Sequence, residues 1–258
     1  MAFIDPEPAV AIMPCWVKGV VNAGKPQKIV SGRIVTYNEF PYLVSLKHMN
    51  EESLEHICGG AIISKWHILT AAHCLDNKTS NDLYVAVGTN HRDFGGDIYP
   101  ISDFAVSNEY DDDDEYYLGD IAILLLEYPL EVKSDSSWKI IKLASESYPV
   151  GTEVVVAGWG DTYFNSTEGS EDLLHIHTHL ADVSECENGA KIREEYHLCT
   201  LSTNGMDACQ GDSGGPLVAN GELIGLVSHG EECGIYPGVY TNVFKYKSSI
   251  EETIALKT

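Results

Sequence analysis

The sequence predicts an all-β protein. Short segments rich in aliphatic and aromatic residues recur along the chain, and Gly, Asn, Asp and Ser fill the gaps between them. This spacing is typical of a β-sandwich or a β-barrel, and it differs from the alternation of strands and helices that builds a parallel sheet. Helical periodicity is confined to the tail, where four apolar residues fall near one face of a helix.

Six segments carry the strand signal, and turn-forming residues separate them. In chain order, the expected strands are residues 42–47, 61–64, 83–87, 121–126, 153–157 and 223–227. The segment 121–126, IAILLL, is strongly apolar. A helix is expected over 244–256, with Phe244, Tyr246, Ile250 and Ile254 near one face.

Length and charge limit the classes of protein to which the chain can belong. At 258 residues and 44% apolar composition it can bury a large core, and this length suits one all-β or two-lobed unit. The sequence has no run of about 18 apolar residues, so we expect no transmembrane helix. The net charge of −23 disfavours nucleic acid and favours cationic partners. The acidic run at 111–115 is interpreted as a solvated loop.

Seven cysteines indicate disulfides rather than a zinc site, because none of them forms a C-x-x-C pair. Six fall in the body of the chain, which predicts three bridges, an oxidising compartment and a secreted, extracellular protein. The seventh, Cys15, lies in the first segment, and a free thiol, an intermolecular bridge and an artefact of that segment are all open. The six are Cys58, Cys74, Cys186, Cys199, Cys209 and Cys233.

Residues 1–28 make a poor signal peptide. Asp5 and Glu7 stand where a basic start is usual, and the apolar stretch at 9–13 is short. We therefore expect the true signal peptide to be missing from this sequence or misread in it. Two N-x-S/T triplets, at Asn77 and Asn165, fit secretion and glycosylation, although such triplets also occur by chance.

One serine near the C-terminus stands in a context that ordinary structure does not require. The segment DACQGDSGGP at 207–216 surrounds Ser213 with glycines and aspartates. A serine hydroxyl is a poor nucleophile unless a base takes its proton, and a third group must orient that base. His73 in TAAHC and Asp120 in LGDIAILLL each lie next to an apolar strand. Either residue alone is more often structural than catalytic, but with Ser213 they form a candidate triad.

In this order, the three segments resemble the signature segments of the trypsin and chymotrypsin family of serine proteases. The resemblance extends from Ile29 to the end of the chain. It implies two antiparallel six-stranded β-barrels with the active site between them, a lobe boundary at roughly 133–150, and a prosegment at 1–28. The further matching segments are IVSG at 29–32, PYLVSL at 41–46, CGG at 58–60, AGWG at 157–160 and PGVYT at 237–241.

The resemblance implies a role for each catalytic residue. Ser213 would attack the scissile carbonyl, His73 would take and return the proton, and Asp120 would orient the imidazole. Ser228 matches the serine that braces this aspartate, and the backbone N–H groups of Gly211 and Ser213 would form the oxyanion hole. The implied disulfides are Cys58–Cys74, Cys186–Cys199 and Cys209–Cys233.

The resemblance also implies a substrate preference. Six positions before Ser213, the family has the residue at the base of its primary specificity pocket, which here is Asp207. A buried carboxylate is costly without a cation, so an Arg or Lys side chain of the substrate would pair with it. Gly230 and Gly238 match the positions that leave room for a long basic side chain. Polypeptide cleavage after Arg or Lys is therefore expected, with chymotrypsin-like or elastase-like specificity as the alternative.

Two positions depart from the family pattern. His229 follows the bracing serine where most relatives have tryptophan, which leaves the preference for residues before the basic one open. Thr89 stands where a glutamate that binds calcium is usual, so we expect no calcium site, and we expect no other metal and no cofactor. The alternative to an enzyme is an inactive family member that acts as a binding protein, although all three triad residues are present.

The first segment would control activity. By resemblance the mature chain begins at Ile29, whose freed ammonium would pair with Asp212 and order the oxyanion hole. The full chain would then be a monomeric zymogen activated by a cut after Lys28, and protein protease inhibitors would be partners of the active form. Lys28 suits a pocket that ends in Asp207, and the acidic run at 111–115 would attract the basic prosegment. We hypothesise self-activation in trans, with cleavage by another trypsin-like enzyme as the alternative.

Three histidines alternate in the segment LHIHTHL at 174–180. On a strand, His175, His177 and His179 would share one face at intervals of about 7 Å, close enough for two of them to chelate zinc or copper. Polar residues that alternate on a strand more often form its solvated outer face, and that is our expectation here.

Overall fold

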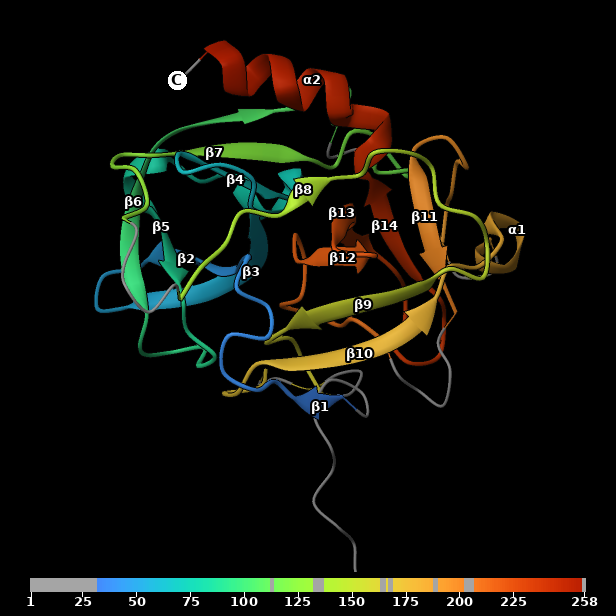
Figure 1. Ribbon diagram of the computed structural model, residues 1–258, viewed down its shortest axis with the longest axis horizontal. Coiled ribbons are helices and arrows are strands. Elements are labelled where there is room, and N and C mark those ends of the chain that lie inside the picture. Colours follow the sequence, from blue (N-terminus) through green and yellow to red (C-terminus); the bar gives the residue numbers. More distant parts are fainter. Residues whose placement is uncertain are drawn as a thin grey trace, which may run out of the picture.

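The computed structural model describes residues 32–111, 114–131, 137–162, 166, 169–187, 190–201 and 207–256. Cys15, Lys28, Ile29 and Asn165 lie outside the described residues. Two β-lobes lie side by side, and the C-terminal helix α2 (Val243–Leu256) crosses one end of the molecule (Figure 1). The prediction of an all-β protein with a C-terminal helix is confirmed.

The first lobe is a closed barrel of six antiparallel strands in the order β2-β3-β4-β7-β6-β5. Its interior is filled by aliphatic side chains that are fully buried, among them Val44, Leu46, Leu83 and Leu124. The bounds are β2 (Leu43–Met49), β3 (Leu54–Ile62), β4 (His67–Thr70), β5 (Leu83–Val87), β6 (Asp97–Val106) and β7 (Ala122–Leu126). Two 3-10 helices, Ala72–Leu75 and Ser80–Asp82, connect β4 to β5.

The second lobe is a curled sheet in the order β1-β10-β9-β12-β13-β14-β11. A bridge between Leu180 and Thr200 joins the regions next to β10 and β11, so the six longer strands nearly close on themselves. One short strand, β8 (Lys142–Leu143), pairs with β13 in parallel. The other bounds are β1 (Arg33–Ile34), β9 (Glu153–Gly158), β10 (Leu174–His179), α1 (Val183–Cys186), β11 (His197–Thr200), β12 (Pro216–Ala219), β13 (Glu222–His229) and β14 (Gly238–Asn242).

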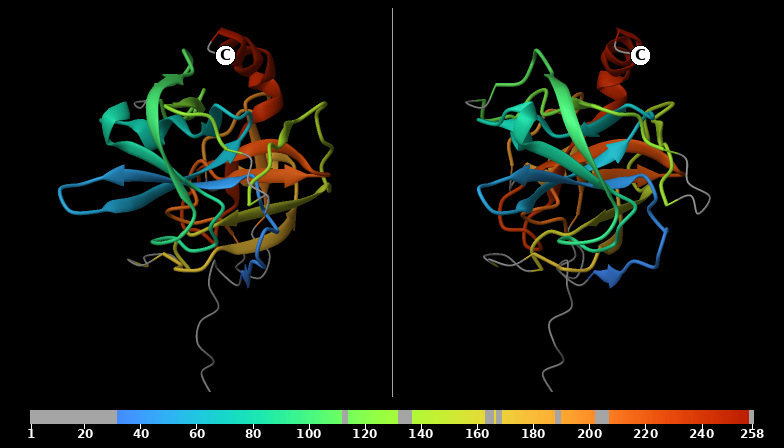
Figure 2. Two further views of the ribbon diagram at one scale, coloured as in Figure 1. Left: turned by 60° about the vertical axis from the view of Figure 1, so that its left-hand side comes forward. Right: turned by 90° about the vertical axis from the view of Figure 1, so that its left-hand side faces the viewer.

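A hydrophobic cluster shared by both lobes and α2 fixes their relative position. Its buried members include Leu69 and Ile123 from the barrel, Leu226 from the second sheet, and Tyr246 and Ile250 from the helix. Burial of apolar surface contributes about 25 cal/mol per Å², so a cluster of this kind holds the lobes together strongly. In both views of Figure 2, α2 lies at the end of the molecule opposite β1.

The helix also reaches the loop that precedes β7. Tyr246 Oη accepts a hydrogen bond from the Gly119 N–H at 3.0 Å and donates one to Glu109 Oε2 at 3.1 Å. Gly119 has a φ of +68°, and a Cβ there would lie 2.7 Å from the backbone of Tyr110, so this turn requires glycine. The turn places Asp120 two residues before the start of β7. Among the described helices, none is long and apolar enough to cross a membrane.

Candidate active site

His73 lies in the first 3-10 helix (Ala72–Leu75), and a disulfide ties that helix to the barrel. Cys58 in β3 and Cys74 form this disulfide, with a Cα–Cα distance of 6.2 Å. Ala72 and Leu75, which flank His73 and Cys74 in the chain, are buried in the barrel core. The His73 ring therefore projects from a fixed turn, with 24% of its side chain exposed.

Asp120 is completely buried, and its carboxylate accepts three hydrogen bonds. Its Oδ2 accepts from His73 Nδ1 at 2.9 Å and from Ser228 Oγ at 2.5 Å, and its Oδ1 accepts from the His73 backbone N–H at 3.0 Å. Burial opposes ionisation, but these donors outweigh it and hold the Asp120 pKa below its ordinary value. Thr241 Oγ1 donates to the Asp120 carbonyl oxygen at 2.8 Å and fixes the backbone. The arrangement orients the imidazole through a carboxylate.

The pKa of His73, the partner of this carboxylate, shifts in the opposite direction. Burial disfavours the imidazolium form of His73, but the hydrogen bond and the charge of Asp120 outweigh burial and raise the His73 pKa above its ordinary value. With Nδ1 bonded to Asp120, the proton-accepting nitrogen is Nε2, on the other side of the ring. The ring can therefore take a proton at Nε2 while the carboxylate stabilises the resulting charge.

Ser213 lies in a tight turn that has a glycine on each side of it in the chain. Gly211 and Gly214 have φ values of +93° and +73°, which L side chains rarely adopt. A Cβ on Gly214 would lie 2.2 Å from Thr70 Oγ1, so the turn packs directly against β4. The Ser213 carbonyl accepts from the Gly59 N–H at 2.7 Å. These contacts hold the serine at the border between the two lobes.

His56 supports the same turn and was not singled out from the sequence. Its Nε2 lies 2.9 Å from the Gly211 carbonyl oxygen and its Nδ1 lies 2.8 Å from Ser45 Oγ. Burial, the largest cause, lowers the His56 pKa to about 4, so the ring is neutral at pH 7 and uses one N–H. In the sequence, His56 is marked only by its position two residues before Cys58, and that signal is weak.

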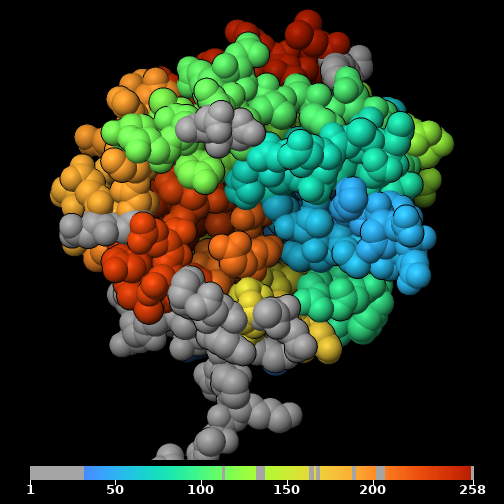
Figure 3. All heavy atoms as spheres, turned by 180° about the vertical axis from the view of Figure 1, so that it is seen from behind, coloured from blue at the N-terminus to red at the C-terminus, as the bar shows by residue number. Residues whose placement is uncertain are grey.

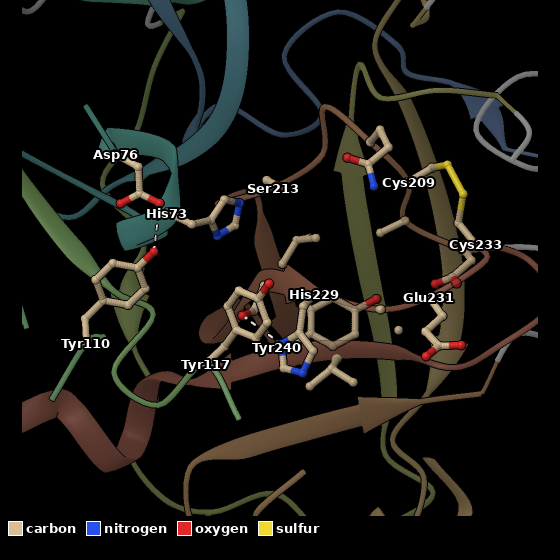
Figure 4. Close-up of a pocket in the computed structure, with 18 residues that line it drawn as sticks. His73, Asp76, Tyr110, Tyr117, Cys209, Ser213, His229, Glu231, Cys233 and Tyr240 are labelled. Atoms are coloured by element: carbon tan, nitrogen blue, oxygen red, sulfur yellow. Dashed lines mark hydrogen bonds between the residues drawn. A yellow bond between two sulfur atoms is a disulfide. The ribbon is translucent and has the colours of Figure 1, made fainter. Parts of the chain in front are cut away.

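His73 and Ser213 line one cavity of about 360 Å³ that also contains Asp207 and Gly238. In Figure 3, orange and red residues of the C-terminal half lie at the bottom of a hollow between the lobes. Figure 4 shows the His73 ring beside Ser213, with Cys209 and Cys233 at the other end. Within the described part of the chain, no hydrogen bond joins the His73 ring to Ser213.

Asp207 lies at the end of this cavity that the Cys209–Cys233 disulfide forms, because it is two residues before Cys209 and is hydrogen-bonded to Gly234. It is 3% exposed, and its Oδ2 accepts from the Gly234 N–H at 3.2 Å. Burial makes the largest contribution to the pKa of Asp207 and raises it to about 7. Among the described residues, no cationic side chain pairs with the carboxylate and offsets this effect. The Cys209–Cys233 disulfide joins the two segments that form this end of the cavity. A buried carboxylate in an open cavity is a site for a cation.

Asp212 is also buried, on the other side of the serine turn. Its carboxylate accepts from the Gly160 N–H at 2.8 Å and from the Cys209 N–H at 2.9 Å. Burial raises the Asp212 pKa to about 6, and within the described ranges no cationic group pairs with it. A Cβ on Gly158 would lie 2.0 Å from Asp212 Oδ1, which explains the glycine in the AGWG segment.

Ser228 and Gly230 also line this cavity, whereas Asn77 and the histidines of β10 do not. Asn77 is exposed in a turn after the first 3-10 helix. The face of β10 is solvated at His177 and His179, as expected, but His175 is only 8% exposed, so the expectation is wrong there. His177 Nδ1 pairs with Glu153 Oε1 at 3.1 Å. Across the described residues, the one group of three potential metal ligands is Cys58, His73 and Cys74, whose cysteines are joined to each other.

The comparisons with known proteins agree with this geometry. The family model described as Trypsin matches residues 29–250. Trypsin epsilon of Drosophila erecta is 35% identical over 254 residues that cover 95% of this chain and 96% of the relative. Trypsin iota of Drosophila melanogaster is 38% identical and covers 84% of each. Mouse neuropsin, a serine protease expressed in the limbic system, matches with a TM-score of 0.76 and 30% identity over 86% of this chain and 98% of neuropsin. The chain belongs to the trypsin family of serine proteases.

Proposed function

We propose that this protein is a serine endopeptidase that cleaves polypeptides after Arg or Lys. The observation that supports the proposal most strongly is one cavity lined both by His73 and Ser213 and by a buried Asp207, which pairs with no cationic side chain among the described residues. A substrate Arg or Lys side chain that reaches Asp207 brings the carbonyl carbon of the same residue to Ser213. Chymotrypsin-like or elastase-like specificity has less support, because an apolar side chain would leave the carboxylate unpaired.

The reaction follows the serine protease template. Ser213 Oγ attacks the scissile carbonyl carbon as His73 Nε2 takes the hydroxyl proton, and Asp120 stabilises the imidazolium that forms. The N–H groups of Gly211 and Ser213 bind the oxyanion, and the positive φ of Gly211 supports their common orientation. His73 then returns the proton to the leaving amine, and a water molecule repeats the sequence on the acyl-enzyme.

The same proposal includes activation and secretion. Cleavage after Lys28 frees the Ile29 ammonium, which pairs with Asp212. Its support is the buried Asp212 carboxylate, which among the described residues has backbone donors but no cation. Secretion is supported by the three disulfides, which form in oxidising compartments. Asn77 is exposed enough to carry a glycan.

Labelling of the active serine tests the enzyme assignment. The full chain is cut after Lys28 by an added protease, which is then removed, and a fluorophosphonate probe is applied with Ser213→Ala as the control. We expect labelling of the cut wild type alone and hydrolysis of Arg and Lys peptide substrates in preference to Phe or Ala substrates. A cut wild type without label would favour the alternative, an inactive member of the family that acts as a binding protein.

A further inference from the structure

The Asp120 carboxylate is linked through Ser228 to a second histidine, His229. Ser228 Oγ lies 2.5 Å from Asp120 Oδ2 and 3.1 Å from His229 Nδ1. The other ring nitrogen, His229 Nε2, lies 3.3 Å from the Lys191 carbonyl oxygen. Figure 4 shows His229 beside Tyr117 in the wall of the cavity. A run of polar contacts therefore leads from His73 through Asp120 and Ser228 to a further imidazole.

The number of hydrogens on each group determines which group donates and which accepts in each of these hydrogen bonds. Asp120 is ionised, because its pKa is below the ordinary value, so it only accepts and takes the single hydroxyl proton of Ser228. Ser228 Oγ can then only accept from the ring, which requires a proton on His229 Nδ1. The Lys191 carbonyl also accepts only, which requires a proton on Nε2. A neutral imidazole has one N–H and can satisfy one of these two contacts.

The surroundings of the ring favour the tautomer with the proton on Nδ1. Burial, the largest cause, lowers the His229 pKa to about 4, so the ring is neutral at pH 7. The contact with Ser228 is the shorter and is partly buried, and an unprotonated Nδ1 would direct its lone pair at the hydroxyl oxygen. The Lys191 contact is exposed, so water can replace the missing donor there.

Two aromatic neighbours hold the plane of the His229 ring. Tyr117 stacks on it with ring centroids 4.8 Å apart and planes 21° apart, and His197 meets it edge-on at 5.5 Å. His197 is itself fixed, because its Nδ1 accepts from the Arg193 N–H at 3.1 Å. The Nδ1–H of His229 is therefore held in place toward Ser228 before any substrate binds.

We propose that His229 is a positioning residue of the catalytic site. Its Nδ1–H donates a hydrogen bond to Ser228 Oγ. The Ser228 hydroxyl then donates its own hydrogen to Asp120, and this bond keeps the carboxylate directed at His73. Donation to the hydroxyl oxygen also polarises it and strengthens the bond that it makes to Asp120. This inference rests on the proposed function, since it concerns the same triad. His229 acts through Ser228 and Asp120 and does not contact the reacting atoms.

Three substitutions separate the hydrogen bond from the ring. His229→Phe keeps the stack on Tyr117 without a donor, His229→Asn places an amide nitrogen near the position of Nδ1, and His229→Gln places one near Nε2. A small arginine ester with no residues before the arginine is the substrate, so that contacts of the ring with longer peptides do not contribute. Each enzyme is quantified by titration of its active serine, which counts only folded, active molecules.

We expect His229→Phe and His229→Gln to lower kcat about three- to tenfold, the range for loss of one hydrogen bond, with KM changed less than about twofold. His229→Asn should keep kcat within about twofold of the wild type. A Phe variant with wild-type kcat, or an Asn variant as slow as the Phe variant, overturns the positioning role. A wild type that neither reacts with the fluorophosphonate nor cleaves the ester overturns the proposed function instead, so the two failures are distinguishable.

Discussion

Gly238 lies directly against Asp207, and a Cβ built on Gly238 would lie 2.7 Å from Asp207 Oδ1. Real Cβ atoms do not approach oxygen so closely, so the position of the carboxylate depends on the absence of a side chain at 238. Gly230 differs, because a Cβ there would meet the Pro237 carbonyl oxygen at 3.4 Å, an ordinary contact. The two glycines that line this cavity thus differ: Gly238 makes room for the carboxylate, whereas position 230 has ordinary space for a methyl group.

Gly238→Ala tests this difference. The new methyl group should displace the Asp207 carboxylate and lower kcat/KM for an arginine ester about tenfold to a hundredfold, the loss that a misplacement of about 1 Å causes. Gly230→Ala is the matched control, with one methyl group added in the same pocket. We expect its effect to fall mainly on KM for substrates with long side chains. Equal losses in kcat/KM and in KM for the two variants would contradict the assignment.

Asp207→Ser tests the basis of the specificity. A guanidinium or ammonium group would then enter the pocket without a counter-charge, which should cost about 3–5 kcal/mol of transition-state binding. The kcat/KM for Arg and Lys peptides should fall at least a hundredfold, while that for a Phe peptide should change much less. An Asp207→Ser enzyme that cleaves after Arg with near wild-type efficiency would show that the cation binds elsewhere.

The raised pKa of Asp207 predicts that cation binding depends on pH. Burial raises this pKa to about 7, and a cationic ligand requires the ionised form. The dissociation constant of a small aromatic amidine should therefore rise about tenfold for each pH unit below 7 and level off above it. Calorimetric titration of the activated enzyme between pH 5 and 8 measures this dependence. Affinity that is constant from pH 5 to 7 would mean that Asp207 is ionised throughout.

The same raised pKa affects stability with a definite sign. The pKa of Asp207 is about 7 in the folded chain and has its ordinary value of 3.8 in the unfolded chain, so the folded chain binds this proton more tightly. Stability from this group is present below about pH 4 and is lost as pH rises through 7. Other carboxylates add their own pH dependence, so the prediction concerns a difference between two variants.

Urea unfolding at pH 5 and pH 7 measures that difference. The background is Ser213→Ala, which prevents self-digestion, and Asp207→Asn is compared with it. Going from pH 5 to pH 7, the parent should lose more unfolding free energy than the Asn variant, by about 1–3 kcal/mol for a shift of this size. The same pH dependence in both proteins would contradict the raised pKa.

Several strands of ordinary length were predictable from the sequence, but the two longest strands, β6 and β3, were not. Residues 83–87 coincide with β5, and 153–157 lie within β9. The strand β6 lies outside the predicted segments, and it contains Pro100, a residue that is unfavourable in the middle of a sheet. The ladder accommodates it next to a register shift between Ile101 and Asp103. The expected segment 61–64 contains only the end of β3.

Local motifs predicted the candidate site and one of its supports, Ser228, but several other supporting residues were not predictable in this way. Ser213, His73 and Asp120 each lie in a distinctive short segment, but His56, Tyr246 and His197 act through contacts between distant parts of the chain. Such contacts depend on how two lobes pack, and no spacing within one segment encodes them. The neutral state of His229 likewise follows from burial, which the sequence alone does not give.

The hypothesis of self-activation in trans gains a structural qualification. Glu115, in the acidic run, pairs with Lys191 at 3.6 Å, and Arg193 lies over the Tyr116 ring at 4.4 Å. Two basic side chains therefore already lie at this loop, which reduces the attraction for a basic prosegment. Exposed charges are also screened within about 8 Å at physiological ionic strength. We therefore expect the acidic run to accelerate cleavage after Lys28 only modestly, by about two- to fivefold at low salt.

The experiment mixes Ser213→Ala zymogen with a trace of active enzyme and follows cleavage after Lys28 at low and high salt. The active enzyme carries either the wild-type run or the pair Asp111→Asn and Asp114→Asn. The control carries Glu251→Gln and Glu252→Gln on α2, which removes the same charge from the exposed helix. Only the first pair should slow cleavage, and high salt should remove that difference. An equal rate for both pairs would assign the acidic run to solubility alone, and no cleavage at all would mean that another protease activates the chain.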